Sequence, residues 1–262
     1  MNSSAPSSTI APMKQSVIFL GPDISDSLRL LAYRVAEQTG LKCNESENPG
    51  PEQHDLVWDE SKQVFALKLA PAQPSLTLDL LKQSRYFLAQ SSRSKKTPLV
   101  RALGKKAFQG GLVWDASGGS GRDLCHLLSL GVERLWVFER HPVVYALLVF
   151  ETYQLKRYLD SKIELEVFYA DASNFQTEEI ADVVFYDPMY PEKKKKSSLS
   201  RKAMEVFKDL VGPDLDEVNC LKKLVQSPHK RVVLKRPLKA KALISGVSTE
   251  FKGSTTRYDL YV

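Results

Sequence analysis

The residues best suited to chemistry lie in one short loop, Asp187-Pro188-Met189-Tyr190. The loop directly follows residues 183–186, an unbroken apolar run that is typical of a buried parallel strand. The Asp187 carboxylate and a backbone carbonyl could together accept both N–H groups of an amino group on a nucleobase and orient its nitrogen for attack. Pro188 would stiffen the loop, and the Tyr190 ring could stack on a base turned out of its helix. The alternative is an ordinary proline-rich turn after a strand.

A second chemically suggestive stretch, residues 112–123, joins an apolar strand to a helix through small residues. Asp115 ends the strand, and Ser117, Gly119 and Gly121 follow it at two, four and six positions. This spacing fits the cofactor loop of class I methyltransferases, which use S-adenosylmethionine (AdoMet, also written SAM). It departs from the dinucleotide fingerprint G-x-G-x-x-G, because no glycine stands at the third glycine position. The loop therefore favours AdoMet, with an ordinary strand-to-helix turn as the alternative.

Two further predicted strands also end in acidic residues. Residues 134–138 run into Glu139 and Arg140, and residues 163–169 end near Asp171. A carboxylate at the end of a strand can accept hydrogen bonds from both hydroxyls of a ribose, which is the function we expect for Glu139. Asp171 could reach the edge of the adenine ring. Because the carboxyl ends of parallel strands meet at one edge of a sheet, these side chains are expected to share one cofactor site.

The elements that position these residues form a repeated strand–helix pattern from Leu112 onward. Such a pattern predicts a parallel sheet with right-handed crossovers. The remaining strands are predicted at residues 183–186 and 231–235, and residues 247–252 and 256–262 are expected to form a terminal antiparallel hairpin. We therefore predict an α/β fold of the class I methyltransferase (Rossmann-like) type, with a mostly parallel seven-stranded sheet.

The residues before this pattern predict a smaller α+β domain over residues 15–81. Its expected elements are a strand at 16–20, a helix from 23–26 through Gln38, a loop at 43–53, a hairpin of 56–58 with 64–69, and a strand at 76–80. Residues 1–14 are rich in Ser, Pro and Ala, lack the pattern of a signal peptide, and are predicted to be a disordered tail. Residues 82–110 predict a basic connecting helix and linker, and residues 111–262 the AdoMet-binding domain.

Composition narrows the class of protein. The 262 residues are 43% hydrophobic and 26% charged, which is ordinary for a globular protein. No apolar run reaches the roughly 18 residues that a membrane span needs. The three cysteines show no C-x-x-C spacing, which argues against a disulfide framework or a zinc site and fits a reducing cytoplasm. We therefore expect a cytoplasmic protein without a membrane span or a metal; oligomeric state cannot be predicted from these features.

The chain carries a net charge of +6, which suits an anionic partner. Its cations gather near the predicted active site and in the connecting segment, where phosphates of a nucleic acid could bind them. A solvated linker is an equally good interpretation of residues 82–110, and a solvated surface is the alternative for the lysine run. The candidate RNA-binding residues are Arg93, Lys95, Lys96, Lys193, Lys194, Lys195, Lys196, Arg201, Lys235 and Arg236.

Six segments, taken together, match a known family. They are Asp-Ala-Ser-Gly-Gly-Ser-Gly-Arg-Asp at 115–123, Glu-Arg-His-Pro-Val-Val at 139–144, Tyr-Asp-Pro-Met-Tyr-Pro at 186–191, Phe-Lys-Asp-Leu-Val-Gly-Pro-Asp at 207–214, Val-Leu-Lys-Arg-Pro at 233–237 and Arg-Tyr-Asp-Leu-Tyr at 257–261. They resemble the RsmJ family of bacterial methyltransferases, which transfer a methyl group from AdoMet to N2 of a guanine in small-subunit (16S) ribosomal RNA. The resemblance extends from about Leu76 to the C-terminus.

The resemblance implies both a substrate and a set of cofactor contacts. The implied partner is 16S ribosomal RNA or the small ribosomal subunit. Where the family often has a pair of serines, this chain has Asp171-Ala172. The implied AdoMet contacts are Arg122, Asp123, Glu139, Arg140, Asp171, Ala172 and Asp187.

Three other functions remain open from the residues. The first is a methyltransferase that acts on DNA adenine, a protein side chain or a small molecule. The second is a non-catalytic RNA-binding assembly factor that keeps the fold and would bind RNA in a salt-sensitive way without turnover. The third, an NAD-dependent oxidoreductase, is disfavoured by the missing third glycine.

Overall fold

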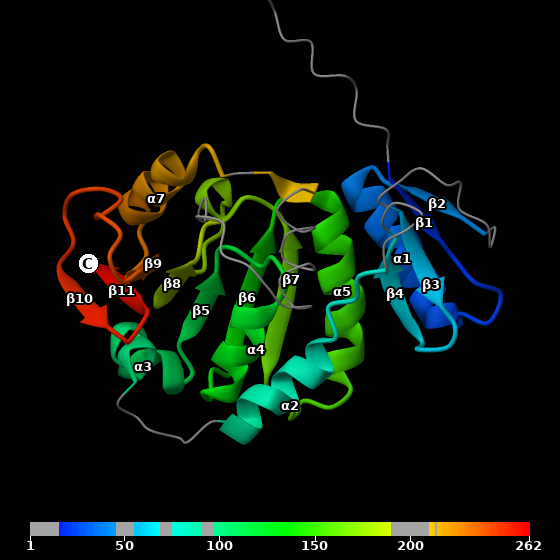
Figure 1. The fold of residues 1–262 in the computed structure, drawn as a ribbon, viewed down its shortest axis with the longest axis horizontal. Coiled ribbons are helices and arrows are strands. Elements are labelled where there is room, and N and C mark those ends of the chain that lie inside the picture. The colour runs from blue at the N-terminus through cyan, green and yellow to red at the C-terminus, as the bar shows by residue number, and fades with distance from the viewer. Residues whose placement is uncertain (1–15, 46–54, 69–74, 91–96, 190–209, 213) are drawn as a thin grey trace, which may run out of the picture.

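The structure is a computed structural model, which describes residues 16–45, 55–68, 75–90, 97–189, 210–212 and 214–262. The predicted tail at 1–14 lies outside these ranges. Figure 1 shows a central twisted sheet flanked by helices, with a second, smaller sheet beside it. No helix in the described part of the chain is long and apolar enough to cross a membrane.

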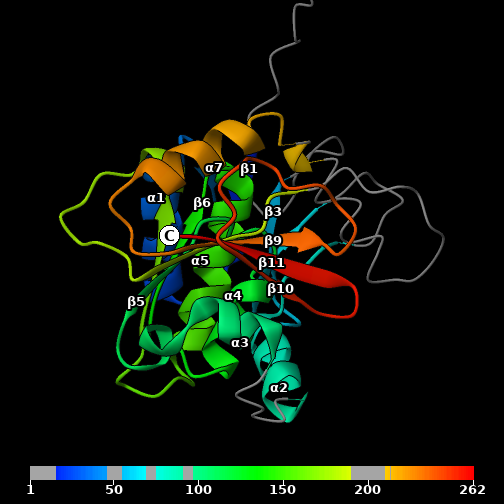
Figure 2. The same cartoon turned by 90° about the vertical axis from the view of Figure 1, so that its left-hand side faces the viewer.

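The central sheet has seven strands in the order β10-β11-β9-β8-β5-β6-β7. Strands β5 to β9 are parallel, whereas β11 runs antiparallel to β9 and pairs with β10. The bounds are β5 (Leu112–Asp115), β6 (Arg134–Glu139), β7 (Glu164–Tyr169), β8 (Val183–Tyr186), β9 (Val232–Pro237), β10 (Thr249–Lys252) and β11 (Thr256–Tyr261). Figure 2 views the hairpin end of the sheet, where β9, β10 and β11 lie between helices α7 (Glu217–Gln226) and α3 (Pro98–Leu103). The predicted fold class is confirmed.

Alternate residues of the strands face the two sides of this sheet, since side chains in a strand alternate with a period of two. Val113 and Val233 pack into the core on the side of α4 (Arg122–Ser129) and α5 (Pro142–Lys156). Leu112, Trp114, Val232 and Leu234 pack on the other side with α7 (Glu217–Gln226). The sheet is therefore buried on both faces, as a parallel sheet with crossover helices requires.

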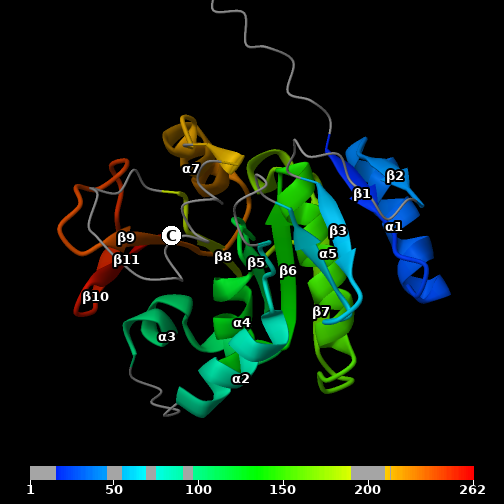
Figure 3. The same ribbon diagram turned by 45° about the vertical axis from the view of Figure 1, so that its right-hand side comes forward.

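The smaller sheet has the strand order β2-β1-β3-β4 and packs against α5. Figure 3 shows this smaller sheet beside α5. The ring of Phe65 on β4 stacks on that of Phe150 on α5, with centroids 4.0 Å apart, and both belong to one continuous core. The bounds are β1 (Val17–Phe19), α1 (Asp26–Thr39), β2 (Lys42–Asn44), β3 (Leu56–Asp59) and β4 (Val64–Leu67). The division of the chain at residues 81 and 110 stays a prediction.

Two local predictions in this region are wrong. The first two residues of the loop expected at 43–53 belong to an edge strand, β2, because Lys42–Asn44 pairs in parallel with β1; residues 46–53 of that loop lie outside the described residues. The strand expected at 76–80 is reduced to one bridge between Leu76 and Leu67. There Asp79 accepts a hydrogen bond from the backbone N–H of Lys82 and so begins α2 (Leu80–Gln90), which covers much of the predicted basic helix. The next helices are α3 (Pro98–Leu103) and the short η1 (Lys105–Phe108).

Candidate active site

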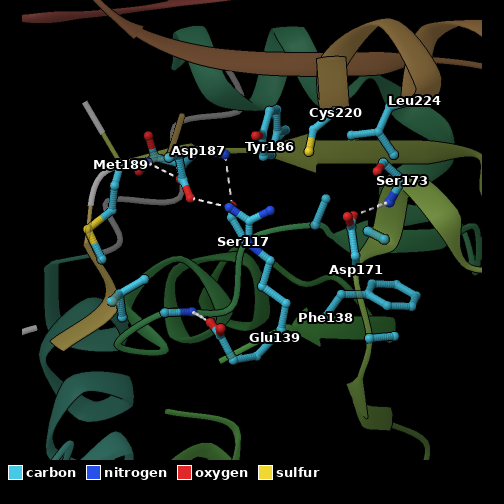
Figure 4. A pocket seen from close by; sticks show the side chains of 17 residues that line it. Ser117, Phe138, Glu139, Asp171, Ser173, Tyr186, Asp187, Met189, Cys220 and Leu224 are labelled. Carbon is cyan, nitrogen blue, oxygen red and sulfur yellow. Dashed lines mark hydrogen bonds and ion pairs between the residues drawn. The ribbon is translucent and has the colours of Figure 1, made fainter. Parts of the chain in front are cut away.

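A pocket opens at the carboxyl edge of the central sheet, where β5, β6, β7 and β8 end. It encloses about 660 Å³ of space when its open mouth is included. Its lining combines carboxylates from three strand ends, among them Glu139 and Asp187, with an apolar wall that includes Phe138 and Leu224 (Figure 4). Glu139, Asp171 and Asp187, which the sequence places at strand ends, thus line one pocket, whereas Asp115 does not; their role toward a cofactor stays a prediction.

The glycine loop after β5 shapes one wall of this pocket. Ser117 and Gly119 line the pocket, whereas Asp115 and Gly121 lie behind it. Asp115 is fully buried, and its Oδ1 accepts the backbone N–H of Ser117 at 3.2 Å, which closes the turn. Burial raises the pKa of Asp115 to about 8, and the neighbouring Asp123 adds to this rise. Gly121 has a left-handed φ of 71° before α4, and a Cβ there would meet Leu80 at 2.4 Å.

Glu139 at the end of β6 presents a buried carboxylate to the pocket. Its Oε2 accepts the backbone N–H of Gly119 at 2.8 Å, and its Oε1 accepts that of His141 at 2.7 Å. Burial raises the pKa of Glu139, while these backbone N–H groups act in the opposite direction. Each carboxylate oxygen keeps a lone pair beyond these bonds, so Glu139 can accept hydrogen bonds from hydroxyl groups of a ligand.

Arg140 also lines the pocket, but its guanidinium is paired within the protein. It contacts Asp216 at 2.7 and 2.9 Å and Oδ1 of Asp214 at 2.6 Å. Hydrogen bonding to Arg140 lowers the pKa of Asp216 to about 2. The other oxygen of Asp214 accepts the backbone N–H of Met189 at 2.8 Å. Asp214 thereby ties the loop after β8 to the end of β6.

Asp171 and Ala172 follow β7 and line the far side of the pocket. The Asp171 carboxylate accepts the backbone N–H of Ser173 at 2.8 Å and the side-chain amide of Asn174 at 2.9 Å. It therefore caps η2 (Ala172–Asn174), the short 3-10 helix whose first residue, Ala172, is buried beneath it. Both residues lie where the sequence placed them, at the end of the third predicted strand.

Arg122 and Asp123 in the first turn of α4 lie outside the pocket lining. The guanidinium of Arg122 lies over the ring of Phe87, 5.2 Å from its centroid. Arg101 makes a similar contact with Phe251 at the hairpin, at 5.1 Å. Asp123 instead pairs with Lys235.

Asp187 stands at the mouth of the pocket on the loop after β8. Its backbone N–H donates to Oγ of Ser117 at 2.8 Å, and its Oδ2 is 2.8 Å from the Nζ of Lys235. Burial raises the pKa of Asp187 to about 7; Lys235 opposes this rise and Asp123 adds to it. Pro188 behind it is buried. Asp187 can therefore change its protonation state near neutral pH.

The predicted RNA-binding residues divide into two groups. Lys235 pairs with Asp123 and Asp187, and Arg236 is only 8% exposed and donates to the backbone carbonyl of Lys241 at 2.9 Å. We therefore revise the interpretation of these two cations, because their charges are directed into the protein. Tyr190, predicted in the catalytic loop to stack on the base, lies outside the described residues. The remaining predicted RNA-binding residues also lie outside them, namely Arg93, Lys95, Lys96, Lys193, Lys194, Lys195, Lys196 and Arg201.

Two functional features were missed by sequence reasoning. Asp214 and Asp216 hold Arg140, and Lys235 joins Asp123 to Asp187. The sequence held a signal for the contact with Arg140, since Asp214 is the last residue of the Val-Gly-Pro-Asp segment. No signal in local spacing pointed to the second.

Comparison with known proteins shows which proteins this chain resembles in sequence and in fold. The family model for SAM-dependent methyltransferases matches residues 35–262. The ribosomal RNA small subunit methyltransferase J of Bdellovibrio bacteriovorus is 38% identical over 191 residues, covering 71% of this chain and 74% of that protein. The protein of the same name from Shewanella piezotolerans is 35% identical over 243 residues, covering 87% and 86%. The SAM-dependent methyltransferase NGO1261 from Neisseria gonorrhoeae has the same fold, with a TM-score of 0.69 at 23% identity over 94% of this chain and 96% of that one.

Proposed function

Because this chain belongs to the ribosomal RNA small subunit methyltransferase J family of SAM-dependent methyltransferases, we propose that it methylates the exocyclic N2 of a guanine in 16S ribosomal RNA. The observation that supports this most directly is the position of Asp187, a carboxylate at the mouth of the pocket that also contains Glu139. The partner that we propose is 16S ribosomal RNA or the small ribosomal subunit, in the cytoplasm.

The residues of the pocket fit AdoMet. Glu139 offers carboxylate oxygens for the two hydroxyls of a ribose, and the apolar wall of Phe138, Ala172 and Leu224 suits the faces of an adenine ring. Asp171 lies beside that wall, where polar groups of a base could reach it. When bound, AdoMet supplies an electrophilic methyl group on a sulfonium, whose thioether is a good leaving group.

Asp187 then has a defined task toward the amine. The lone pair of N2 is delocalised into the purine ring, so the nitrogen is a weak nucleophile. An ionised Asp187 can accept an N–H hydrogen bond from N2 and favour the pyramidal nitrogen of the transition state. N2 uses its lone pair to form the new N–C bond while the C–S bond breaks and its electrons stay on sulfur. N2 then gives up one proton, which Asp187 can accept.

The test is methyl transfer from labelled AdoMet to separated substrates: 16S ribosomal RNA, small ribosomal subunits, DNA and total protein. We expect label in 16S ribosomal RNA and, after digestion, in N2-methylguanosine. Asp187→Asn should lower kcat by orders of magnitude while AdoMet affinity, measured by calorimetry, stays within a few fold. The control is Asp160→Asn, which changes an exposed carboxylate in the turn before β7. Label only in DNA or protein, or full activity of Asp187→Asn, would contradict the proposal.

A further inference from the structure

A lysine behind the pocket contacts the proposed catalytic carboxylate. We propose that Lys235 is a positioning residue, which holds Asp187 ionised and directs it toward the methyl acceptor. The inference rests on the proposed function of Asp187 and adds a residue that acts through it.

The geometry around Lys235 is a small charge cluster. Its Nζ is 2.8 Å from Oδ2 of Asp187 and 2.8 and 3.0 Å from the two oxygens of Asp123. All three side chains are mostly buried, with exposed fractions of 24% for Lys235, 17% for Asp123 and 26% for Asp187. Of the three residues, Asp187 alone lines the pocket. The ammonium group of Lys235 can therefore act on a ligand in the pocket through Asp187.

The sheet places these residues together through strand register. β8 and β9 pair in parallel with Tyr186 opposite Leu234, so Asp187 and Lys235 follow at the same level. Since Leu234 packs on the side of α7, Lys235 as the next residue faces the side of α4. Asp123 stands in the first turn of α4, on that side. The arrangement is therefore a consequence of the fold, and not of one flexible side chain.

The cluster has an electrostatic consequence for Asp187. Two neighbouring carboxylates without a cation would favour sharing a proton, because like charges at short range disfavour joint ionisation. Burial lowers the pKa of Lys235, but Asp123 and Asp187 more than offset this and raise it, so Lys235 stays protonated. Its positive charge lowers the pKa of Asp187 against the effect of burial. An ionised carboxylate is the form that can accept the N–H of an amine and its proton.

Other ionisable groups face the cluster from neighbouring elements. They are Asp115 on β5, His126 on α4 and Tyr258 on β11, and Asp214 contacts the same loop through Met189. Asp115 and Asp214 are acidic, and Tyr258 is uncharged at neutral pH, while burial raises its pKa further. Burial also lowers the pKa of His126, which favours its neutral form. None of these four supplies a lasting positive charge, so Lys235 is the cation among the described residues that opposes the effect of burial on Asp187.

The test compares Lys235→Met, Lys235→Arg and Asp123→Asn with the wild type. The first readout is the titration of the Asp187 carboxyl, followed by NMR of the protein labelled with ¹³C-aspartate and assigned through Asp187→Asn. Lys235→Met should raise the pKa of Asp187 by about 1–3 units, whereas Asp123→Asn should lower it. Lys235→Arg should restore most of the wild-type value. This readout requires no RNA, so it separates the present inference from the proposed substrate.

The second readout is the pH profile of kcat, measured with the methyl acceptor that the wild type uses. If Lys235→Met raises the pKa of Asp187 by about one to two units, kcat at pH 7 should fall by about 5- to 50-fold, and activity should recover at higher pH. Asp123→Asn should move the profile to lower pH.

An unchanged titration of Asp187 in Lys235→Met, or shifts in the same direction in Lys235→Met and Asp123→Asn, would overturn the inference. If Lys235→Met does not fold, Lys235→Gln is measured in its place, with the same expected rise in the pKa of Asp187. Failure of the wild type to methylate 16S ribosomal RNA would refute only the proposed substrate.

Discussion

The contact between Asp214 and the loop that carries Asp187 leads to a quantitative prediction. Oδ2 of Asp214 accepts the backbone N–H of Met189 at 2.8 Å, two residues beyond Asp187, and Oδ1 holds Arg140 at 2.6 Å. Asp214→Ala removes both contacts and leaves the Met189 N–H without this acceptor. The loop then loses the anchor that fixes its distance from the end of β6.

The expected magnitude follows from the kind of bond that is lost. A hydrogen bond to a charged group contributes about 1.5–3 kcal/mol. If that energy serves to hold Asp187 in its reactive position, kcat should fall by about 10- to 150-fold, since each 1.36 kcal/mol corresponds to a factor of ten. The Arg140 contact adds less, because Arg140 is 40% exposed and such pairs contribute up to about 1 kcal/mol.

The assay is steady-state methyl transfer, with kcat and KM determined separately for AdoMet and for the RNA. Asp214→Asn serves as a partial variant, because the side-chain carbonyl of asparagine can still accept the Met189 N–H. Asp216→Asn serves as the matched control, since Asp216 also holds Arg140 but makes no bond to Met189. We expect a large fall in kcat for Asp214→Ala, an intermediate fall for Asp214→Asn, and less than about a fivefold effect for Asp216→Asn.

Two results would refute this reasoning. Wild-type kcat in a folded Asp214→Ala would mean that the Met189 contact does not position Asp187. An equal loss in Asp216→Asn would assign the effect to Arg140 and not to the loop.

Four further predictions concern pH dependence, stability and cofactor binding. Because Asp187 has a pKa of about 7 and is active when ionised, kcat should fall as the pH drops below about 7, and a flat profile between pH 6 and 8 would argue against this function. Asp115 has a folded-state pKa of about 8, above its unfolded value, so the folded protein binds the extra proton between about pH 4 and 8 and loses stability as the pH rises. Relative to Asp115→Asn, the wild type should therefore lose up to about 1.4 kcal/mol per pH unit from pH 5 to 8, measured by urea unfolding; parallel curves would contradict this. Phe150→Ala should destabilise the protein by about 3–5 kcal/mol, because its buried ring stacks on Phe65, and a loss below 1 kcal/mol would mean that the smaller sheet does not depend on this contact. Glu139→Gln should weaken AdoMet binding by about tenfold, measured by calorimetry, because the amide NH2 group cannot accept the hydrogen bonds that a carboxylate oxygen accepts from the backbone and from a ribose hydroxyl; unchanged affinity would show that Glu139 does not bind the ribose.

Much of the central sheet could be predicted because its determinants are local. The apolar run at residues 183–186 is buried on both faces in the structure, as its composition indicates. Ser25 caps α1 and Gly40 ends it in the left-handed conformation, both of which are properties of a few neighbouring residues. The same holds for the acidic residues at the strand ends, since a strand boundary and the side chain that follows it are adjacent in the sequence.

The contacts that organise the site are of another kind. Lys235 and Asp123 lie 112 positions apart, and Arg140 and Asp214 lie 74 apart. Their pairing depends on the order and register of β5, β6, β8 and β9, which periodicity does not reveal. The local sequence pattern likewise did not predict that Lys42–Asn44 would pair with the edge of β1, or that Asp79 would begin a helix. The sequence by itself determined which residue types stand at the end of each strand, because that information is local. Only the tertiary structure decided which of these charges neutralise one another, because electrostatic pairing requires proximity in space.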